Sequence, residues 1–349
     1  MSVITATMSE HDSTTPTDAV ELYLETRANE LADSTYRSQK CRLERFAEWC
    51  DENGVETLDQ LGGKHLQEYR IFLRDHYTQK DGSKGVSPLT IRTRLCTVRV
   101  FLRFAASIDA VEPTLAERMV LPTVDREQRY REEIIDSEDA KDTLDALRAN
   151  RYGEKAHVVF ELLWQTGCRL GGVHSLDIDD VDEDNQWIEL HHRPDEGTTL
   201  KNEERGERYI AVTEQLLEII DQYIQLHRIP VTDEYGREPL LTTEHGRPDK
   251  STLRNWAYLA QLPCYQRNVC PHDEDIASCE KRRVYGRDEC PSTTMPHNIR
   301  RGRITDLLSQ DVPKRAVSDR VDVAGDILDT HYDQRSEAGK AEQRRNFFT

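Results

Sequence analysis

Pro296-His297-Asn298-Ile299-Arg300 leads into a helix that we predict over residues 299–309. Side chains three positions apart share one face of a helix, so His297 and Arg300 can converge on the same group. A guanidinium offers paired N–H donors that match the oxygens of a phosphate, and an imidazole can add a hydrogen bond or carry a proton. This stretch therefore predicts a site that handles a phosphate.

Three further pieces stand in a fixed order around this stretch. They are Arg169 after Thr166-Gly167, Lys201 in the polar turn of a hairpin predicted from strands over residues 186–191 and 208–212, and His331-Tyr332 near the C-terminus. A phosphodiester attacked by an oxygen nucleophile gains negative charge in its transition state, which guanidinium groups can neutralise without a metal. A tyrosine, with an ordinary pKa of about 10, needs such positive charge beside it to become a nucleophile.

The Thr-Gly-x-Arg motif, the hairpin lysine, the Pro-His-x-x-Arg motif and the late tyrosine, in this order, resemble the tyrosine recombinase or phage integrase family. The resemblance is to its Xer- and lambda-integrase-like members and, within them, to a haloarchaeal integrase-like subgroup. It covers about residues 17–349. It implies that five residues carry the reaction: Tyr332 as nucleophile, Arg169 and Arg300 as phosphate-binding cations, His297 as phosphate ligand or proton relay, and Lys201 as general acid for the leaving 5′ oxygen.

The same resemblance implies a function and its partners. The chain would cut and rejoin double-stranded DNA at specific sites through a 3′-phosphotyrosyl intermediate. Four copies would assemble on two DNA sites. No cofactor would be needed for catalysis.

The pattern of the whole chain predicts a mainly helical fold with a small β-sheet. Residues 1–16 are polar and are predicted to form a disordered leader. Amphipathic helices are predicted over residues 17–112, a charged linker over 113–131, and further helices with the hairpin over 132–349. The resemblance implies that the first part is a SAM-like core-binding domain that clamps DNA and that the second is an α+β catalytic domain.

Two positions depart from the family pattern. Val323 stands nine residues before Tyr332, where the family commonly carries a second histidine or a tryptophan, and Gly172 replaces an acidic residue usual three after the first arginine. Arg320 is a candidate substitute for the missing contact. The departures leave open two alternatives: a catalytically degenerate DNA-binding regulator of the same fold, and a type IB-like topoisomerase.

Charge and hydropathy indicate the surroundings of the chain. Lys and Arg number 47 against 65 Asp and Glu, a net charge of −18, and 11 of the 47 are Lys. An acidic surplus with few lysines is typical of halophilic proteins, and at molar salt the Debye length is about 3 Å, so this charge hardly repels DNA. Between Arg254 and Arg303 the balance reverses to nine basic against six acidic residues.

With no apolar run of 18 residues and no signal peptide, the sequence predicts a cytoplasmic protein with no membrane partner.

Half of the eight cysteines lie within 27 residues, in an insertion over residues 263–291: Cys264, Cys270, Cys279 and Cys290. Disulfides are disfavoured in a cytosolic protein, and small Cys-rich segments often need a metal to hold their shape. The spacing is not the C-x2-C of common zinc fingers, so two interpretations stay open. One is a structural Zn²⁺ bound by four cysteines, or by three with His272; the other is a set of reduced, buried thiols.

Overall fold

The computed structural model describes residues 14–79, 81–124, 134–310, 312–325, 327–328 and 345. The chain divides into two compact units, Met1–Arg131 and Glu132–Thr349. Each unit has a large hydrophobic core of its own. Within the described ranges, no helix is long and apolar enough to cross a membrane.

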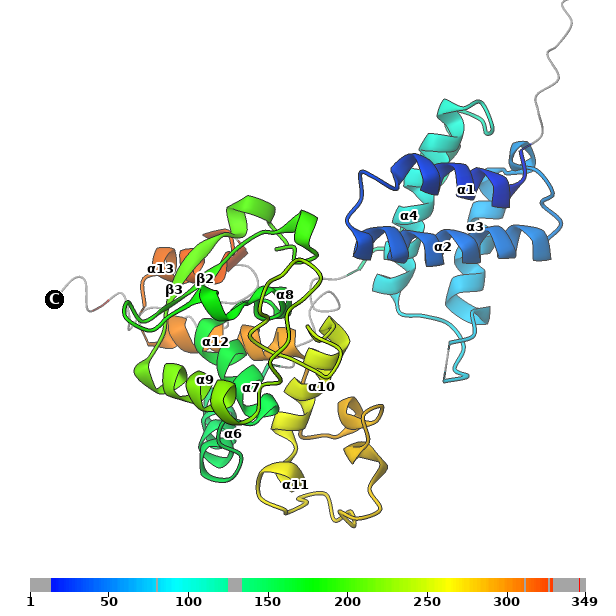
Figure 1. Cartoon of the computed structure of the whole chain (residues 1–349). Coiled ribbons are helices and arrows are strands. Elements are labelled where there is room, and N and C mark those ends of the chain that lie inside the picture. The colour runs from blue at the N-terminus through cyan, green and yellow to red at the C-terminus, as the bar shows by residue number, and fades with distance from the viewer. Residues whose placement is uncertain are drawn as a thin grey trace, which may run out of the picture. The chain divides into compact units, whose positions relative to one another are not determined.

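The first unit is a bundle of helices (Figure 1). It contains α1 (Pro16–Arg27), α2 (Asp33–Glu52), α3 (Gly63–Ile71) and α4 (Pro88–Ser107), the 3-10 turns η1 (Leu58–Gln60) and η3 (Leu115–Arg118), and the π-helical turn η2 (Phe72–His76). Two starts have a proline in the first turn and a side-chain cap: the hydroxyl of Thr15 accepts from the backbone of Asp18, and that of Ser87 from Thr90.

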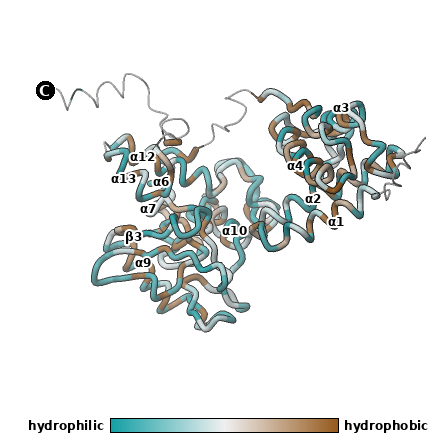
Figure 2. The backbone as a smooth tube through the Cα atoms, turned by 90° about the horizontal axis from the view of Figure 1, so that it is seen from above, coloured by the Kyte–Doolittle hydropathy of each residue, from teal (hydrophilic) through white to brown (hydrophobic). Residues whose placement is uncertain are grey.

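Aromatic rings from three helices fill the core of the first unit. Phe46 of α2, Tyr69 of α3 and Phe101 of α4 are fully buried. The Phe46 ring meets the other two edge-on, with centroids 5.0 Å from Tyr69 and 6.3 Å from Phe101. Figure 2 shows hydrophobic and hydrophilic positions interleaved along these helices, because each turns one face to the core. Leu115 and Met119 also pack in this core, so part of the segment predicted as a linker belongs to the first unit.

The second unit is mainly helical with one small sheet (Figure 1). Its helices are α6 (Ser137–Asn150), α7 (Lys155–Thr166), α8 (Leu170–Ser175), α9 (Glu214–Leu226), α10 (Lys250–Gln261), α11 (Pro263–Gln266), α12 (Pro296–Ser309) and α13 (Lys314–Val321). Its 3-10 turns are η4 (Ile178–Asp180), η5 (Pro194–Glu196), η6 (Glu203–Gly206), η7 (Glu280–Arg282) and η8 (Arg287–Glu289). The predicted fold class, mainly α with a small β-sheet, is confirmed.

The sheet is an antiparallel meander of β1 (Val181–Asp182), β2 (Trp187–Leu190) and β3 (Arg208–Ala211). Ile188 pairs with Ile210, and both are buried, whereas the residue before Ile210 on β3, Tyr209, is 59% exposed. This alternation turns one face of the hairpin to the core. The hairpin was predicted from the sequence, but the two-residue strand β1 was not.

Helix α7 lies in the middle of the second unit and packs against α6, α9, α10 and α12. Of its twelve residues, ten are buried. Helix α12 reaches its place because Gly302 has no side chain: a Cβ there would lie 2.3 Å from the backbone oxygen of Ile135. This close approach fixes α12, which carries the Pro-His-x-x-Arg motif.

Candidate active site

Arg300 is the most buried of the predicted site residues, with 1% of its surface exposed. Its terminal nitrogens donate to the backbone oxygens of Gly167, at 2.8 Å, and Val321, at 2.6 Å. Gly167 ends α7 with a φ of 63°, a left-handed conformation that favours glycine, and Val321 is the last residue of α13. Arg300 therefore joins the ends of two helices to the second turn of α12.

Arg169 comes two residues after Gly167, as the residue that precedes α8. Its guanidinium donates to the Asp322 carboxylate at 2.8 Å and to the Asp322 backbone oxygen at 3.1 Å. Asp322 directly follows Val321 and has a φ of 52°, which aspartate tolerates better than most residues. The consecutive residues Val321 and Asp322 thus hold Arg300 and Arg169 side by side.

His297 lies one turn before Arg300 on α12, and its ring remains exposed at the surface. Partial burial lowers the pKa of the imidazole, and the positive charges of Arg300, Arg301, Arg169 and Lys201 lower the pKa further. The ring is therefore neutral at neutral pH, with one nitrogen able to accept a proton.

Lys201 lies in the turn of the hairpin between β2 and β3 and is exposed. The next residue, Asn202, donates from its amide to the second oxygen of Asp322 at 2.7 Å. Asp322 thus bridges Arg169 and the Lys201 turn. The structure brings four of the five predicted residues to one place, and Tyr332, with its neighbour His331, lies outside the described residues.

At the positions that depart from the family pattern, the side chains take part in packing or in contacts that stabilise the fold. Val323 is 7% exposed and packs in a small core with Ile304 and Val317. At Gly172 a Cβ would lie 3.4 Å from the side chains of Cys168 and Leu190, so this position packs closely against both. Arg320 donates to the backbone oxygens of Ala211 and Gln165, both at 2.9 Å, and joins β3 to the end of α7.

Asp322 is the residue of this site that the sequence did not single out. It lies 153 positions from the arginine that it binds. Only its tolerance of a left-handed φ at a helix end marks the position locally. A contact between residues this far apart leaves no periodic pattern in a single sequence.

No family model matches the chain. It is 22% identical over 304 residues to a probable integrase/recombinase protein of Methanocaldococcus jannaschii, covering 85% of this chain and 81% of that protein. It is 23% identical over 310 residues to the tyrosine recombinase XerD of Staphylococcus haemolyticus, covering 86% and 88%. Over most of its length the chain is therefore similar to proteins of the tyrosine recombinase family.

A solved structure is similar to this chain at the level of the fold. The integrase of the Tn1549 transposon, solved in complex with a circular intermediate DNA, superposes with a TM-score of 0.67 over 96% of this chain and 100% of that chain, at 16% identity. The relatives support the predicted family and, with it, the predicted class of enzyme, a site-specific recombinase. The haloarchaeal subgroup stays a prediction.

The Cys-rich segment over residues 263–291 gathers its four cysteines around one small cavity. Cys264, Cys270, Cys279 and Cys290 all line it together with His272, and its volume is about 20 Å³. Burial raises the pKa of the Cys264 thiol; the positive charge of Arg282 opposes that rise, and the other three thiols add to it. Nε2 of His272 lies 2.8 Å from the Ser292 hydroxyl. Among the described residues, no three Cys, His, Asp or Glu side chains are already arranged to hold a metal.

The segment leads directly into the start of α12. The side-chain amide of Gln261, at the end of α10, donates to the Thr294 backbone oxygen and accepts from the Thr294 N–H, both at 2.9 Å. The Thr294 hydroxyl accepts from the Asn298 amide at 2.9 Å. These contacts fix the approach to Pro296 and His297.

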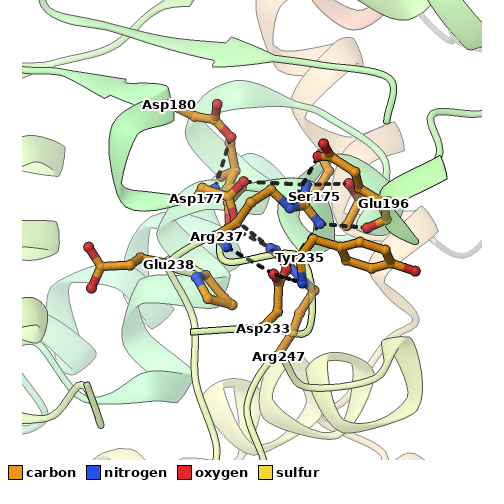
Figure 3. Close-up of polar contacts among 12 residues, drawn as sticks. Ser175, Asp177, Asp180, Glu196, Asp233, Tyr235, Arg237, Glu238 and Arg247 are labelled. Atoms are coloured by element: carbon orange, nitrogen blue, oxygen red, sulfur yellow. Dashed lines mark hydrogen bonds and ion pairs between the residues drawn. The ribbon is translucent and has the colours of Figure 1, made fainter. Parts of the chain in front are cut away.

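A cluster of acidic residues and arginines lies at the C-terminal end of α8 (Figure 3). Its members are Asp177, Asp180, Asp233, Arg193, Arg237 and Arg247. Burial raises the pKa of Asp177, and the nearby guanidinium groups of Arg247 and Arg237 limit that rise. For Asp233, burial opposes ionisation but hydrogen bonds led by that from Arg247 bring the pKa below its usual value. The sequence did not predict this cluster.

Proposed function

We propose that this recombinase cuts and rejoins double-stranded DNA at specific sites through a 3′-phosphotyrosyl link to Tyr332. The observation that carries the proposal is the convergence of Arg169, Lys201, His297 and Arg300 from three separate segments. Catalysis requires no cofactor, as is the rule in this family.

The two arginines would neutralise the charge that develops on the attacked phosphate. Arg300 is already oriented by its two backbone partners, so little reorganisation is needed when the phosphate arrives. Arg169 donates to one carboxylate oxygen and to the backbone oxygen of Asp322, and a phosphate offers two oxygens to the same pair of donors. We propose that the scissile phosphate takes over this guanidinium from Asp322 when DNA binds.

Proton transfer would divide between two residues. The neutral His297 would hydrogen-bond the phosphate or accept the proton of the Tyr332 hydroxyl as its oxygen attacks phosphorus. Lys201 would donate a proton to the 5′ oxygen as its bond to phosphorus breaks. Because one phosphate ester replaces another, the link keeps the energy of the cut bond, and rejoining needs no ATP.

The two units, the subgroup and the assembly follow from the same proposal. The helical first unit would bind DNA, the second unit would carry out catalysis, and four copies would act on two sites. The net charge of −18 fits a haloarchaeal protein that works at high salt inside the cytoplasm, where only close contacts to phosphate contribute.

We further propose that the four cysteines of the Cys-rich segment hold one structural Zn²⁺ with no part in catalysis. The shared cavity supports this, because its volume of about 20 Å³ suits a single small ion. His272 already has a hydroxyl partner, which favours four thiolates over three with the histidine. Metal analysis of the purified chain should give one zinc, lost in Cys279→Ser and kept in a control, Cys41→Ser; a wild type without zinc would favour reduced thiols.

A suicide DNA substrate tests the main proposal. It carries a nick close to the cleavage point, so that the fragment after the break diffuses away and the covalent link accumulates. We expect a protein–DNA adduct with the wild type at high salt and none with Tyr332→Phe. No adduct with tight, site-specific binding would instead favour the catalytically degenerate regulator, and relaxation of supercoils at sites without sequence preference would favour the topoisomerase.

A further inference from the structure

In the hairpin that carries Lys201, backbone hydrogen bonds close a short loop, residues 193–198, just before the lysine. Arg193 and Thr198 exchange both backbone hydrogen bonds around η5, at 2.8 Å and 3.0 Å. The N–H of Leu200 donates to Nδ1 of His192 at 3.0 Å. The place of this closed loop therefore fixes where the Lys201 turn begins.

Arg237 of the acid–arginine cluster binds this loop through its guanidinium group. Its guanidinium donates to the Thr198 hydroxyl at 2.9 Å and to the Glu196 backbone oxygen at 2.7 Å. It also lies 3.1 Å from Asp233 and 3.4 Å from Asp177. Figure 3 shows Arg237 at the centre of the cluster, between Glu196 on the loop and the two aspartates.

The other side of the cluster belongs to the end of α8, the helix that begins directly after Arg169. Asp177 lies two residues beyond the last residue of α8 and is 5% exposed. Arg247 pairs with Asp177 and donates to the backbone oxygens of His174, at 3.0 Å, and Leu176, at 3.1 Å. The cluster thus joins the hairpin loop to the helix that presents the first arginine.

Lys201 itself makes no ion pair within the part of the chain that the structure describes, and its side chain is exposed. Its position therefore depends on the backbone on either side. On one side that backbone is held by Asn202 through Asp322, and on the other by Thr198 through Arg237.

We propose that Arg237 is a positioning residue for strand cleavage. Through Thr198 and Glu196 it holds the hairpin so that the Lys201 ammonium reaches the leaving 5′ oxygen while Arg169 binds the phosphate. The proposal rests on the proposed role of Lys201 as general acid. It distinguishes Arg237 from an arginine that only stabilises the fold.

Two suicide substrates of identical sequence test this. One has the natural 5′ oxygen at the cleaved bond, and the other has sulfur in its place. A thiolate leaves without a proton, so loss of the general acid slows cleavage only of the oxygen substrate. A general acid contributes roughly a factor of 10² to 10⁴. We expect Lys201→Ala to slow cleavage of the oxygen substrate about a hundredfold or more, and Arg237→Met at least tenfold, with both close to the wild type on the sulfur substrate.

Three further variants make the test specific. Thr198→Val removes the hydroxyl that accepts from Arg237 and leaves the cluster charges in place, so it should show a smaller effect of the same kind. Arg228→Met removes a buried arginine that binds the backbone of Pro239 and does not touch the loop, so it should slow neither substrate. Arg300→Lys should slow both.

The outcomes separate the two proposals. If Lys201→Ala recovers on the sulfur substrate but Arg237→Met and Thr198→Val stay equally slow on both substrates, or are slow on neither, the positioning role is wrong and the general acid stands. If Lys201→Ala itself does not recover, Lys201 is not the general acid and the positioning proposal fails with it. The Tyr332→Phe adduct experiment is unaffected by either result.

Discussion

Replacement of Arg300 by methionine should destabilise the second unit as well as stop cleavage. Methionine matches the length of the arginine stem and removes the guanidinium. The backbone oxygens of Gly167 and Val321 then lose their donors in a region from which water is excluded, since Arg300 is 1% exposed. The change tests whether this residue holds the fold as well as the phosphate.

The expected magnitude follows from these two contacts. A buried acceptor left without its donor costs about 1–3 kcal/mol, so two cost about 2–6 kcal/mol. Part of this is offset because the variant no longer buries a positive charge. We expect a net loss of about 2–4 kcal/mol in the free energy of unfolding, and for a unit of this size a fall in melting temperature of roughly 5–15 °C.

Calorimetry of the full chain at high salt measures this loss. The transition of the first unit is an internal control, because Arg300 lies in the second unit. Arg315→Met, at an exposed position on α13, should leave both transitions unchanged. An Arg300→Met protein that melts like the wild type but forms no covalent adduct would refute the structural role and leave a purely catalytic one.

Three other variants give measurable results. Gly302→Ala places a Cβ 2.3 Å from the Ile135 backbone oxygen, so overpacking should cost about 1–3 kcal/mol in the second unit alone, seen by the same calorimetry. Burial, together with nearby cationic side chains, lowers the pKa of His174 to about 4. As the pH falls, the unfolded chain binds a proton at this histidine before the folded chain does, so the free energy of unfolding should fall by up to about 3 kcal/mol between about pH 6.5 and pH 4. In His174→Gln the free energy of unfolding should depend less on pH over this range. Asp322→Asn keeps the left-handed φ but removes the negative charge that competes with phosphate for Arg169. DNA affinity, measured by titration, should therefore rise by up to about tenfold. An unchanged affinity would contradict the proposal that phosphate replaces Asp322 on Arg169.

Local patterns in the sequence predicted much of the fold. Ser87-Pro88 and Asp136 stand at the starts of α4 and α6, where their side chains cap the helices. The alternation around Ile188 and Ile210 predicted the hairpin, and the motifs predicted the residues that the structure brings together. These features depend on neighbours within a few positions, which one sequence records.

The rest depends on contacts between distant positions. Asp177 and Arg237 are 60 residues apart, so nothing near either residue predicts their pairing. At Val323 the family pattern predicted a missing contact, whereas the structure shows an apolar side chain that completes a small core. A single sequence gives the type of each residue but not which distant residues its side chain contacts in the folded chain.

The two backbone bonds of Arg300 have a consequence for the evolution of such proteins. A descendant that no longer cleaved DNA would still need this arginine to keep α7 and α13 together, so selection for folding alone would preserve it. Its presence in a relative therefore says little about whether that relative is active. The exposed Lys201 has no comparable structural role, so selection for folding would not preserve it. Its replacement would therefore be an earlier sign that a relative has lost catalytic activity.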